Sequence, residues 1–434
     1  MDTRPLNILF ILTDDQGPWA MGCAGNEEII TPNLDRLAET GLRFDNFFCT
    51  SPVCSPARAS LLTGTIPSRH GVQDWIKAGN DGEDRTEYLA GMTGYTEILS
   101  EAGYTCGLSG KWHLGASDTP QKGMAHWYAH QKGSGHYYNP PMYRGSRFVE
   151  DEGYISDLIT DDAISFMTEQ HEADLPFYCG VHFTAPHSPW GPDEHPAEIR
   201  DLYRNCPFDS CPQEAYHPHA TLRFSAEVAR TCLIGYFAAV TAMDRNVGRL
   251  LDSLEELGIR RRTLVVFLSD NGFNCGHHGI WGKGNGTTVL NMYDTSVKVP
   301  ALFSLPGTIR TGLESHALVS GYDFMPTLLE LVGLLDRSGN EAGTELPGRS
   351  FAHLLQPAAE HTATEHAGVD HAPAEHDAAT VGSRDHLVVY DEYGPVRMVR
   401  TERFKYVHRY PYGPHELYDL QEDPEERTNR VDDT

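Results

Sequence analysis

The stretch LNILFILTDD, residues 6–15, holds the pattern that decides the fold. Its apolar residues run from Leu6 to Leu12, and two acids, Asp14 and Asp15, follow. A short apolar run of this kind predicts a buried strand, as is typical of a parallel sheet. The two carboxylates then lie at the carboxyl end of that strand.

The alternation of short apolar runs and longer helical patterns continues along the chain. Further strands are predicted at residues 104–108, 176–183 and 264–268. Helices are predicted at residues 55–63, 95–102, 155–170 and 226–257, with one break allowed in the last. Another helix is expected to begin with Thr31 as its N-cap and Pro32 in its first position. This order predicts an α/β fold, in which a mainly parallel sheet carries helices on both faces.

In such sheets, ligands bind beyond the carboxyl ends of the strands. Acids, an amide, a lysine and histidines follow the predicted strands, namely Asp14, Asp15, Lys111, His113, His187, Asp270 and Asn271. Three carboxylates and an amide oxygen are hard ligands that suit Ca²⁺ or Mg²⁺ rather than zinc. Asp14-Asp15 alone, or Asp270-Asn271 in SDNG alone, is also typical of a turn. Both motifs at strand ends of one sheet favour a metal site.

The stretch CTSPVCSPARASLLTG, residues 49–64, leaves three interpretations of Cys54 open: a nucleophilic thiol, a metal ligand or a buried structural cysteine. Since a helix is predicted from residue 55, Cys54 is expected at its N-terminus, where backbone N–H groups favour an anion. Candidates for holding a tetrahedral anion are Arg58, Lys111 and Lys283. The histidines best placed to carry protons are His113 and His187.

With these residues in view, the chain resembles the type I, formylglycine-dependent sulfatases of the alkaline-phosphatase-like superfamily. CSPARASLLTG matches their C-x-P-x-R signature and the LTG run that follows it. Other segments occur in the family's order, among them ILFILTDDQ, TPNLDRLAETG, GYTCGLSGKWHLG, FTAPHSP, VVFLSDNG, MYDTSVKVP and ELYDLQEDPEE. The resemblance covers nearly the whole chain. It implies an alkaline-phosphatase-like α/β/α sandwich with a smaller C-terminal antiparallel-sheet subdomain.

The resemblance also implies that Cys54 is converted to formylglycine, an aldehyde, by a formylglycine-generating enzyme. Pro56 and Arg58 are then part of the sequence which that enzyme recognises. A divalent cation, Ca²⁺ or Mg²⁺, is implied as well, with ligands from Asp14, Asp15, Asp270, Asn271 and residue 54. Cys49 lacks this context and is expected to be a buried structural cysteine.

The family's mechanism, carried onto this chain, starts with the attack of one hydroxyl of hydrated residue 54 on sulfur. Asp270 is a candidate base for that step. His187 then protonates the departing oxygen, and His113 removes a proton from the second hydroxyl. The cations that would neutralise charge in the transition state are Arg58, Lys111 and Lys283.

The chain departs from the family pattern after Lys283. The residues GNGTTVLN separate it from Met292, which precedes the pair Tyr293-Asp294. GHHGIWGKG still resembles the family's arrangement, so the role of the second active-site lysine is assigned to Lys283. The substrate-binding candidates are His278 beside this insertion and His70 and Trp75 in PSRHGVQDWIKAGN.

Composition narrows the class of partner. The 434 residues include 34 Lys and Arg against 61 Asp and Glu, which gives a net charge of −27. This charge argues against nucleic acid or an anionic membrane as the main partner, and it requires local cations for an anionic substrate. The nine cysteines have no framework spacing, and neither a signal peptide nor a membrane span is predicted. We therefore expect a cytoplasmic enzyme acting on a small sulfated substrate, a sulfated sugar by class.

The chain is expected to have three parts. Residues 1–356 form the catalytic domain, and residues 384–434 form a C-terminal subdomain that packs on it. Residues 357–383 between them are rich in Ala, His and acids, with an acid–His pair every five residues. This composition predicts a solvated linker or loop insertion, with adventitious metal binding by its histidines as the alternative.

Three other functions remain open at this point. A phosphonate monoester or phosphodiester hydrolase of the same superfamily shares the signature and most ligands. An unmodified, inactive protein that only binds sulfated ligands is the second. A zinc-dependent alkaline phosphatase is disfavoured, because it needs Ser or Thr as nucleophile and more histidine ligands.

Overall fold

The structure is a computed structural model that describes residues 4–335, 346–356, 384–391 and 396–433. The linker predicted at residues 357–383 lies outside the described residues.

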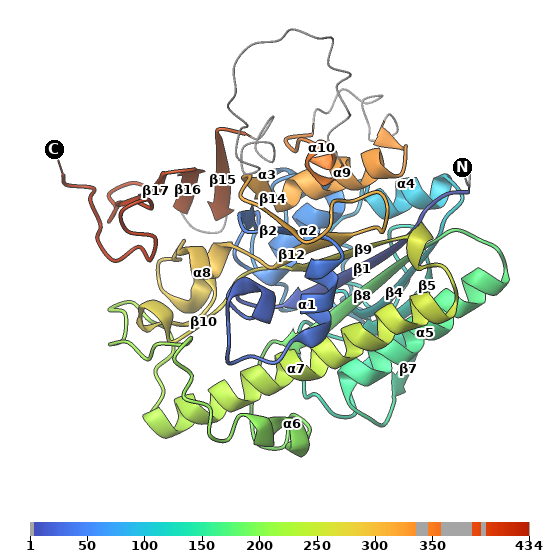
Figure 1. Cartoon of the computed structure of the whole chain (residues 1–434), viewed down its shortest axis with the longest axis horizontal. Coiled ribbons are helices and arrows are strands. Elements are labelled where there is room, and N and C mark those ends of the chain that lie inside the picture. Colours follow the sequence, from blue (N-terminus) through green and yellow to red (C-terminus); the bar gives the residue numbers. More distant parts are fainter. Residues whose placement is uncertain (1–3, 336–345, 357–383, 392–395, 434) are drawn as a thin grey trace, which may run out of the picture.

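A ten-stranded sheet forms the centre of the protein (Figure 1), in the order β13-β2-β12-β9-β1-β8-β4-β5-β6-β7. Its strands are β1 (Asn7–Asp14), β2 (Leu42–Phe44), β4 (Thr105–Lys111), β5 (Met124–His130), β6 (Pro141–Arg144), β7 (Arg147–Glu150), β8 (Phe177–Pro186), β9 (Thr263–Ser269), β12 (Ala301–Ser304) and β13 (Leu313–Ser315). The five central strands, β9 to β5, are parallel. Strands β12, β6 and β7 pair antiparallel with their neighbours. The predicted mainly parallel sheet is thus confirmed at its centre.

Helices cover both faces of this sheet. They are α1 (Pro32–Glu39), α2 (Cys54–Thr63), α3 (Pro67–His70), α4 (Tyr95–Glu101), α5 (Ile155–Glu172), α6 (Ala197–Leu202), α7 (Ala226–Glu256), α8 (Asp294–Val297), α9 (Phe324–Leu331) and α10 (Ala352–Leu355). Single 3₁₀ turns lie at Gly22–Ala24, Arg260–Arg262, His277–Gly279, Gly284–Gly286 and Gly321–Asp323. Helices α5 and α7 cross the sheet on one side, and α2, α4 and α9 lie on the other (Figure 1).

Strand β1 shows how the two layers are built. Successive side chains of a strand point to opposite faces. Ile8, Phe10 and Leu12 belong to the core shared with α2, α4 and α9. Leu9 and Ile11 belong to the core shared with α1, α5 and α7. Because both faces of β1 are buried, its sequence is a continuous apolar run rather than an alternating one, and the α/β/α sandwich is confirmed.

Helix α7 is a single unbroken helix of 31 residues, so the break allowed at this point does not occur. Ser225 caps its N-terminus by accepting a hydrogen bond from the backbone N–H of Val228 at 3.3 Å. Within the described residues, α7 is the one helix that is long and apolar enough to cross a membrane, and 61% of its most apolar window is buried inside the protein. Such burial is that of a core helix.

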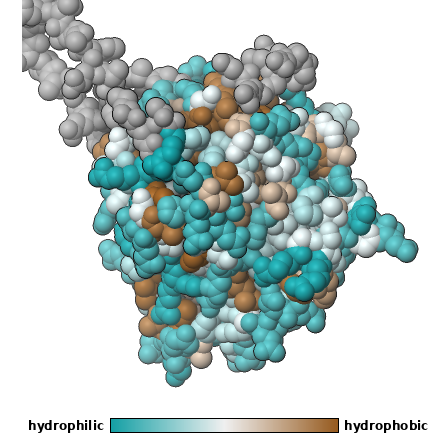
Figure 2. All heavy atoms as spheres, turned by 90° about the vertical axis from the view of Figure 1, so that its right-hand side faces the viewer, coloured by the Kyte–Doolittle hydropathy of each residue, from teal (hydrophilic) through white to brown (hydrophobic). Residues whose placement is uncertain are grey.

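The face in Figure 2 is mostly hydrophilic, with hydrophobic residues in small separate patches.

A separate antiparallel sheet ends the chain, as predicted. Its strands are β15 (His386–Asp391), β16 (Val396–Thr401), β17 (Phe404–Arg409) and β18 (Glu416–Asp419). Leu387, Val389 and Met398 of this sheet belong to the same core as α2. Two short pairs complete the structure, β3 (Phe47–Phe48) with β14 (Val319–Ser320), and β10 (Asn274–Cys275) with β11 (Trp281–Gly282).

The small sheet is also joined to the main domain by a buried cation. The Lys405 side chain on β17 is fully buried and forms ion pairs with Asp294 and Glu426. Its Nζ also donates to the backbone oxygen of Met292 at 2.8 Å. Arg409 donates to the backbone oxygen of Leu290 at 3.4 Å. The C-terminal sheet therefore holds the segment that follows Lys283.

Candidate active site

The carboxyl ends of four neighbouring strands bring polar side chains to one edge of the sheet. Asp14 is the last residue of β1, and Lys111 is the last residue of β4. His187 follows directly after β8, and Asp270 follows directly after β9. Since β9, β1, β8 and β4 are parallel neighbours, these residues meet although they are far apart in sequence.

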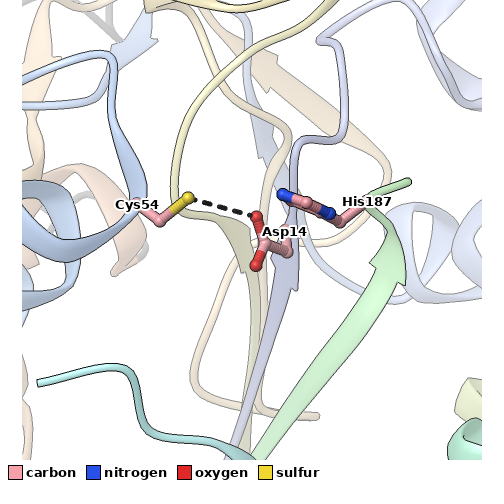
Figure 3. Close-up of side chains that lie close together, drawn as sticks. All are labelled: Asp14, Cys54 and His187. Atoms are coloured by element: carbon pink, nitrogen blue, oxygen red, sulfur yellow. Dashed lines mark hydrogen bonds between the residues drawn. The ribbon is translucent and has the colours of Figure 1, made fainter. Parts of the chain in front are cut away.

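Cys54 reaches the same edge of the sheet from helix α2. It is the first residue of α2, after Val53 in extended conformation at the N-cap. The Cys54 Sγ lies 3.6 Å from Asp14 Oδ1 and 2.6 Å from Lys283 Nζ. Figure 3 shows Cys54 and His187 pointing toward Asp14 from its two sides. Burial and the neighbouring Asp14 raise the pKa of the thiol to about 12, so the free cysteine stays protonated.

Three carboxylates form the floor of the site. Asp14, Asp15 and Asp270 are buried, and an oxygen of each lies within 4.8 Å of the other two. Asn271 donates from its Nδ2 to Asp15 Oδ1 at 2.7 Å. Its Oδ1 is buried and has no hydrogen-bond partner among the described residues. These oxygens are the hard donors that Ca²⁺ and Mg²⁺ prefer, so the residues present fit such an ion.

Three buried cations form ion pairs with these acids. Arg58 lies one turn after Cys54 on α2, and its Nε donates to Asp270 Oδ2 at 2.9 Å. Lys111 forms an ion pair with Asp14, and Lys283 Nζ lies 2.5 Å from Asp15 Oδ1. Burial alone would raise the pKa of Asp14, but Lys111 and the other nearby cations hold it well below its usual value.

His187 is held in one tautomer at the edge of the site. Its Nδ1 lies 2.7 Å from the backbone oxygen of Ser188, an acceptor, so Nδ1 carries the proton. Its Nε2 lies 3.6 Å from Asp15 Oδ2. The side chain is one-fifth exposed, so the imidazole is accessible to a ligand.

His113 is buried, and it is held through its Nε2, whereas His187 is held through its Nδ1. Its Nε2 donates to the backbone oxygen of Ile76 at 3.0 Å. Its Nδ1 is buried and has no hydrogen-bond partner among the described residues. Burial and the charge of Lys111 hold the pKa of His113 well below its usual value, so the ring is neutral. His113 can therefore accept a proton at Nδ1.

A cavity of about 570 Å³ opens onto these groups. Cys54, Asp15, His113, His187 and Lys283 line its polar end. Aromatic side chains line much of the remainder, namely Trp75, Trp190, Phe224, Phe273 and Trp281. Trp75, one of the predicted substrate-binding residues, is 43% exposed.

The other two predicted substrate-binding residues, His70 and His278, do not line this cavity. His70 is buried; its Nε2 lies 3.0 Å from Ser60 Oγ, and its Nδ1 accepts from the N–H of Val72 at 3.1 Å. His278 stacks flat on Tyr293, with ring centroids 3.8 Å apart. Both rings are thus engaged with protein rather than directed at the cavity.

Comparison with known proteins identifies the fold and the activity class. A family model described as Sulfatase matches residues 6–334. The chain belongs to the sulfatase family. A second model, described as the C-terminal part of N-sulphoglucosamine sulphohydrolase, matches residues 276–434 of this sulfatase.

Similar proteins cover nearly the whole sulfatase. An N-acetylglucosamine-6-O-sulfatase of Bacteroides thetaiotaomicron is 29% identical over 99% of this chain and 83% of that protein. An ulvan-active sulfatase of Formosa agariphila is 30% identical over 98% of this chain and 77% of that protein. A solved structure in complex with its substrate D-glucosamine-2-N,6-O-disulfate is 25% identical, with a TM-score of 0.77, and covers 99% of this chain and 94% of that chain. The protein is therefore a sulfuric ester hydrolase.

The structure adds residues to the sulfatase site that sequence reasoning did not single out. Trp190 and Trp281 line the cavity. Trp190 lies close in sequence to His187, and Trp281 lies close to Lys283, so their proximity to predicted site residues could have indicated them. Lys77 lines it two residues after Trp75. Lys132 gives no such signal, because only tertiary packing brings its loop to the cavity.

Proposed function

We propose that this sulfatase hydrolyses the sulfate ester of a carbohydrate, with residue 54 acting as a formylglycine beside a divalent cation. The observation that supports this most is the place of Cys54. It begins a buried helix, where N–H groups favour an anion, and its side chain lies between a carboxylate cluster and the lysine Lys283. A formylglycine-generating enzyme would make the aldehyde from this cysteine.

Asp14, Asp15, Asp270 and Asn271 would hold the cation, Ca²⁺ or Mg²⁺. The buried, unpartnered Oδ1 of Asn271 is the donor atom that this role would use. When bound, such an ion polarises the sulfate and lowers the pKa of a neighbouring hydroxyl. The hydrate of formylglycine carries two hydroxyls, whereas a serine offers one and cannot expel the sulfate once it is bound.

The remaining residues bind charge and move protons. Arg58, Lys111 and Lys283 would neutralise the charge that develops on the sulfate in the transition state. His187 lies at the cavity, where it would carry a second proton on Nε2 and donate that proton to the departing alcohol oxygen, while its Nδ1–H stays bonded to Ser188. His113, with its free Nδ1, would remove a proton from the second hydroxyl of residue 54.

The carbohydrate part of the proposal has two supports. The aromatic lining of the cavity suits the apolar faces of sugar rings, on which aromatic side chains stack. The similar proteins include sulfatases named for N-acetylglucosamine and ulvan, and a structure with a glucosamine disulfate.

The experiment is a screen of sulfated mono- and disaccharides with protein from the native host, combined with peptide mass spectrometry of residues around Cys54. We expect an aldehyde at residue 54 and release of sulfate from at least one saccharide. Matched phosphate esters should be cleaved with a lower kcat/KM. A fully active protein that retains the thiol would refute the proposal, and a preference for phosphate or phosphonate esters would assign the enzyme to the alternative hydrolase class.

A further inference from the structure

Two lysines in the cavity have no acidic partner within the part of the chain that the structure describes. Apart from Asp15, Lys283 and the two histidines of the reaction centre, the charged residues that line the cavity are Lys77 and Lys132. Both side chains are exposed, and no ion pair between described residues includes either of them. The cations of the reaction centre differ from them, because Arg58, Lys111 and Lys283 each pair with a carboxylate.

Both lysines are tied to His113 through a neighbouring residue. Ile76, directly before Lys77, accepts the hydrogen bond of His113 Nε2 at 3.0 Å. Gly133, directly after Lys132, lies against the same ring, since a Cβ atom at Gly133 would be 2.3 Å from His113 Cε1 and Nε2. Two segments more than fifty residues apart in sequence thus each present a lysine one residue away from a contact with His113. The backbone of each lysine therefore lies close to His113, and both side chains line the cavity that contains the reaction centre.

The charge of the protein makes this placement informative. A chain with a net charge of −27 generally repels anions, yet the cavity carries two cations, beyond those of the reaction centre, that form no ion pair with any described residue. A cleft lined by one sign of charge raises the local concentration of ligands of opposite charge. A sugar with a single sulfate would use the reaction-centre cations and leave Lys77 and Lys132 without an anionic partner.

The side chain of Lys77 is also in position to act with an aromatic platform. Its Nζ lies 4.7 Å from the ring centroid of Trp75. Trp75, Lys77 and Asn285 also line a second hollow of about 260 Å³ next to the main cavity. Lys77 thus lines both hollows and lies beside the exposed ring of Trp75.

We propose that Lys77 and Lys132 bind a second anionic group of the substrate, a sulfate or a carboxylate, so that the enzyme prefers doubly anionic saccharides. This inference rests on the proposed carbohydrate sulfatase function. Both lysines are specificity-determining residues and take no part in breaking the sulfate ester.

The test compares three substrates with the same scissile sulfate: one with no other charge, one with a second sulfate and one with a carboxylate. The variants are K77M, K132M and the double variant, in which methionine keeps an unbranched apolar stem. The control is R245M, which removes one positive charge from the exposed side of α7.

We expect the wild type to prefer at least one doubly anionic substrate. The double variant should lose about tenfold of this preference in kcat/KM, which is about 1.4 kcal/mol and is the size expected for losing a hydrogen bond to a charged group. The loss should appear mainly in KM and shrink at high salt. R245M should keep the wild-type preference. The substrate with the larger loss identifies the second group as sulfate or carboxylate.

The outcomes separate the two proposals. If no sulfated saccharide is cleaved, the proposed function fails. If the wild type cleaves singly and doubly anionic substrates equally well, or the double variant slows all three substrates equally, the inference about the lysines fails while the sulfatase function stands.

Discussion

The close approach of Gly133 to His113 predicts that a single methyl group at this position will slow the reaction. In G133A the new Cβ would lie 2.3 Å from His113 Cε1 and Nε2 and 2.7 Å from Cδ2. Carbon atoms in contact are about 3.5 Å or more apart, so the ring would have to move by about 1 Å. Gly133 is outside the left-handed region, so its backbone accepts alanine and the effect is steric.

The ring of His113 has little freedom to make this movement. It is 3% exposed and is fixed by the hydrogen bond to Ile76. A displacement of about 1 Å costs on the order of 100-fold in rate. That is about 2.7 kcal/mol in activation free energy, because each factor of ten is about 1.36 kcal/mol. Overpacking is also expected to lower the free energy of unfolding by about 1–3 kcal/mol.

The assay is steady-state kinetics on the best saccharide from the screen, together with a thermal melt. We expect kcat of G133A to fall about 100-fold. G191A is the matched control, because its Cβ would have its nearest neighbour at 3.6 Å and its backbone is also outside the left-handed region. In an H113A background G133A should have little further effect, since the clashing ring is gone. A wild-type kcat in G133A, or an equal loss in both backgrounds, would refute the reasoning.

Three further predictions concern the nucleophile, the cation and the response to acid. C54A should abolish turnover and C54S nearly so, whereas C49S should cost only about 1–2 kcal/mol of stability and keep its activity; equal rates in C54S and wild type would contradict the formylglycine role. Chelation should abolish sulfate release, and added Ca²⁺ or Mg²⁺ should restore it. The added ion should also raise the melting temperature, because an ion bound only by the folded state stabilises that state. Full activity after exhaustive chelation would exclude the metal role. Burial lowers the pKa of His70 from 6.5 to about 4, so the unfolded state binds more protons and stability should fall as pH drops from about 6.5 to 4, by up to about 3 kcal/mol. Urea melts of wild type and H70Q at pH 7 and pH 5 measure this, and an equal pH response of the two proteins would show that His70 does not contribute.

The central strands and the residues at their ends could be predicted because their signals are local. β1 is an apolar run buried on both faces, and parallel neighbours place the residues after each strand at the same edge. Edge strands could not be predicted in the same way. β7, RFVE, is largely exposed, so no apolar pattern distinguishes it from a loop.

The partners of individual side chains also could not be predicted from the sequence. Thr31 does occupy the N-cap position of α1, but its hydroxyl makes no capping bond and instead accepts from the N–H of Gly22 at 2.8 Å. His70 resembles other polar loop histidines in sequence, and only the folded chain shows that Ser60 and Val72 enclose it. Such contacts depend on segments that no local pattern relates to each other.

The buried Lys405 makes the reaction centre depend on the small antiparallel sheet. Lys405 and Arg409 hold backbone oxygens between residues 290 and 292, in the segment that follows Lys283. The position of a reaction-centre lysine thus depends on strands of a separate sheet, far from it in sequence. Removal of residues 384–434 should therefore inactivate the enzyme, although every proposed catalytic residue lies before residue 384.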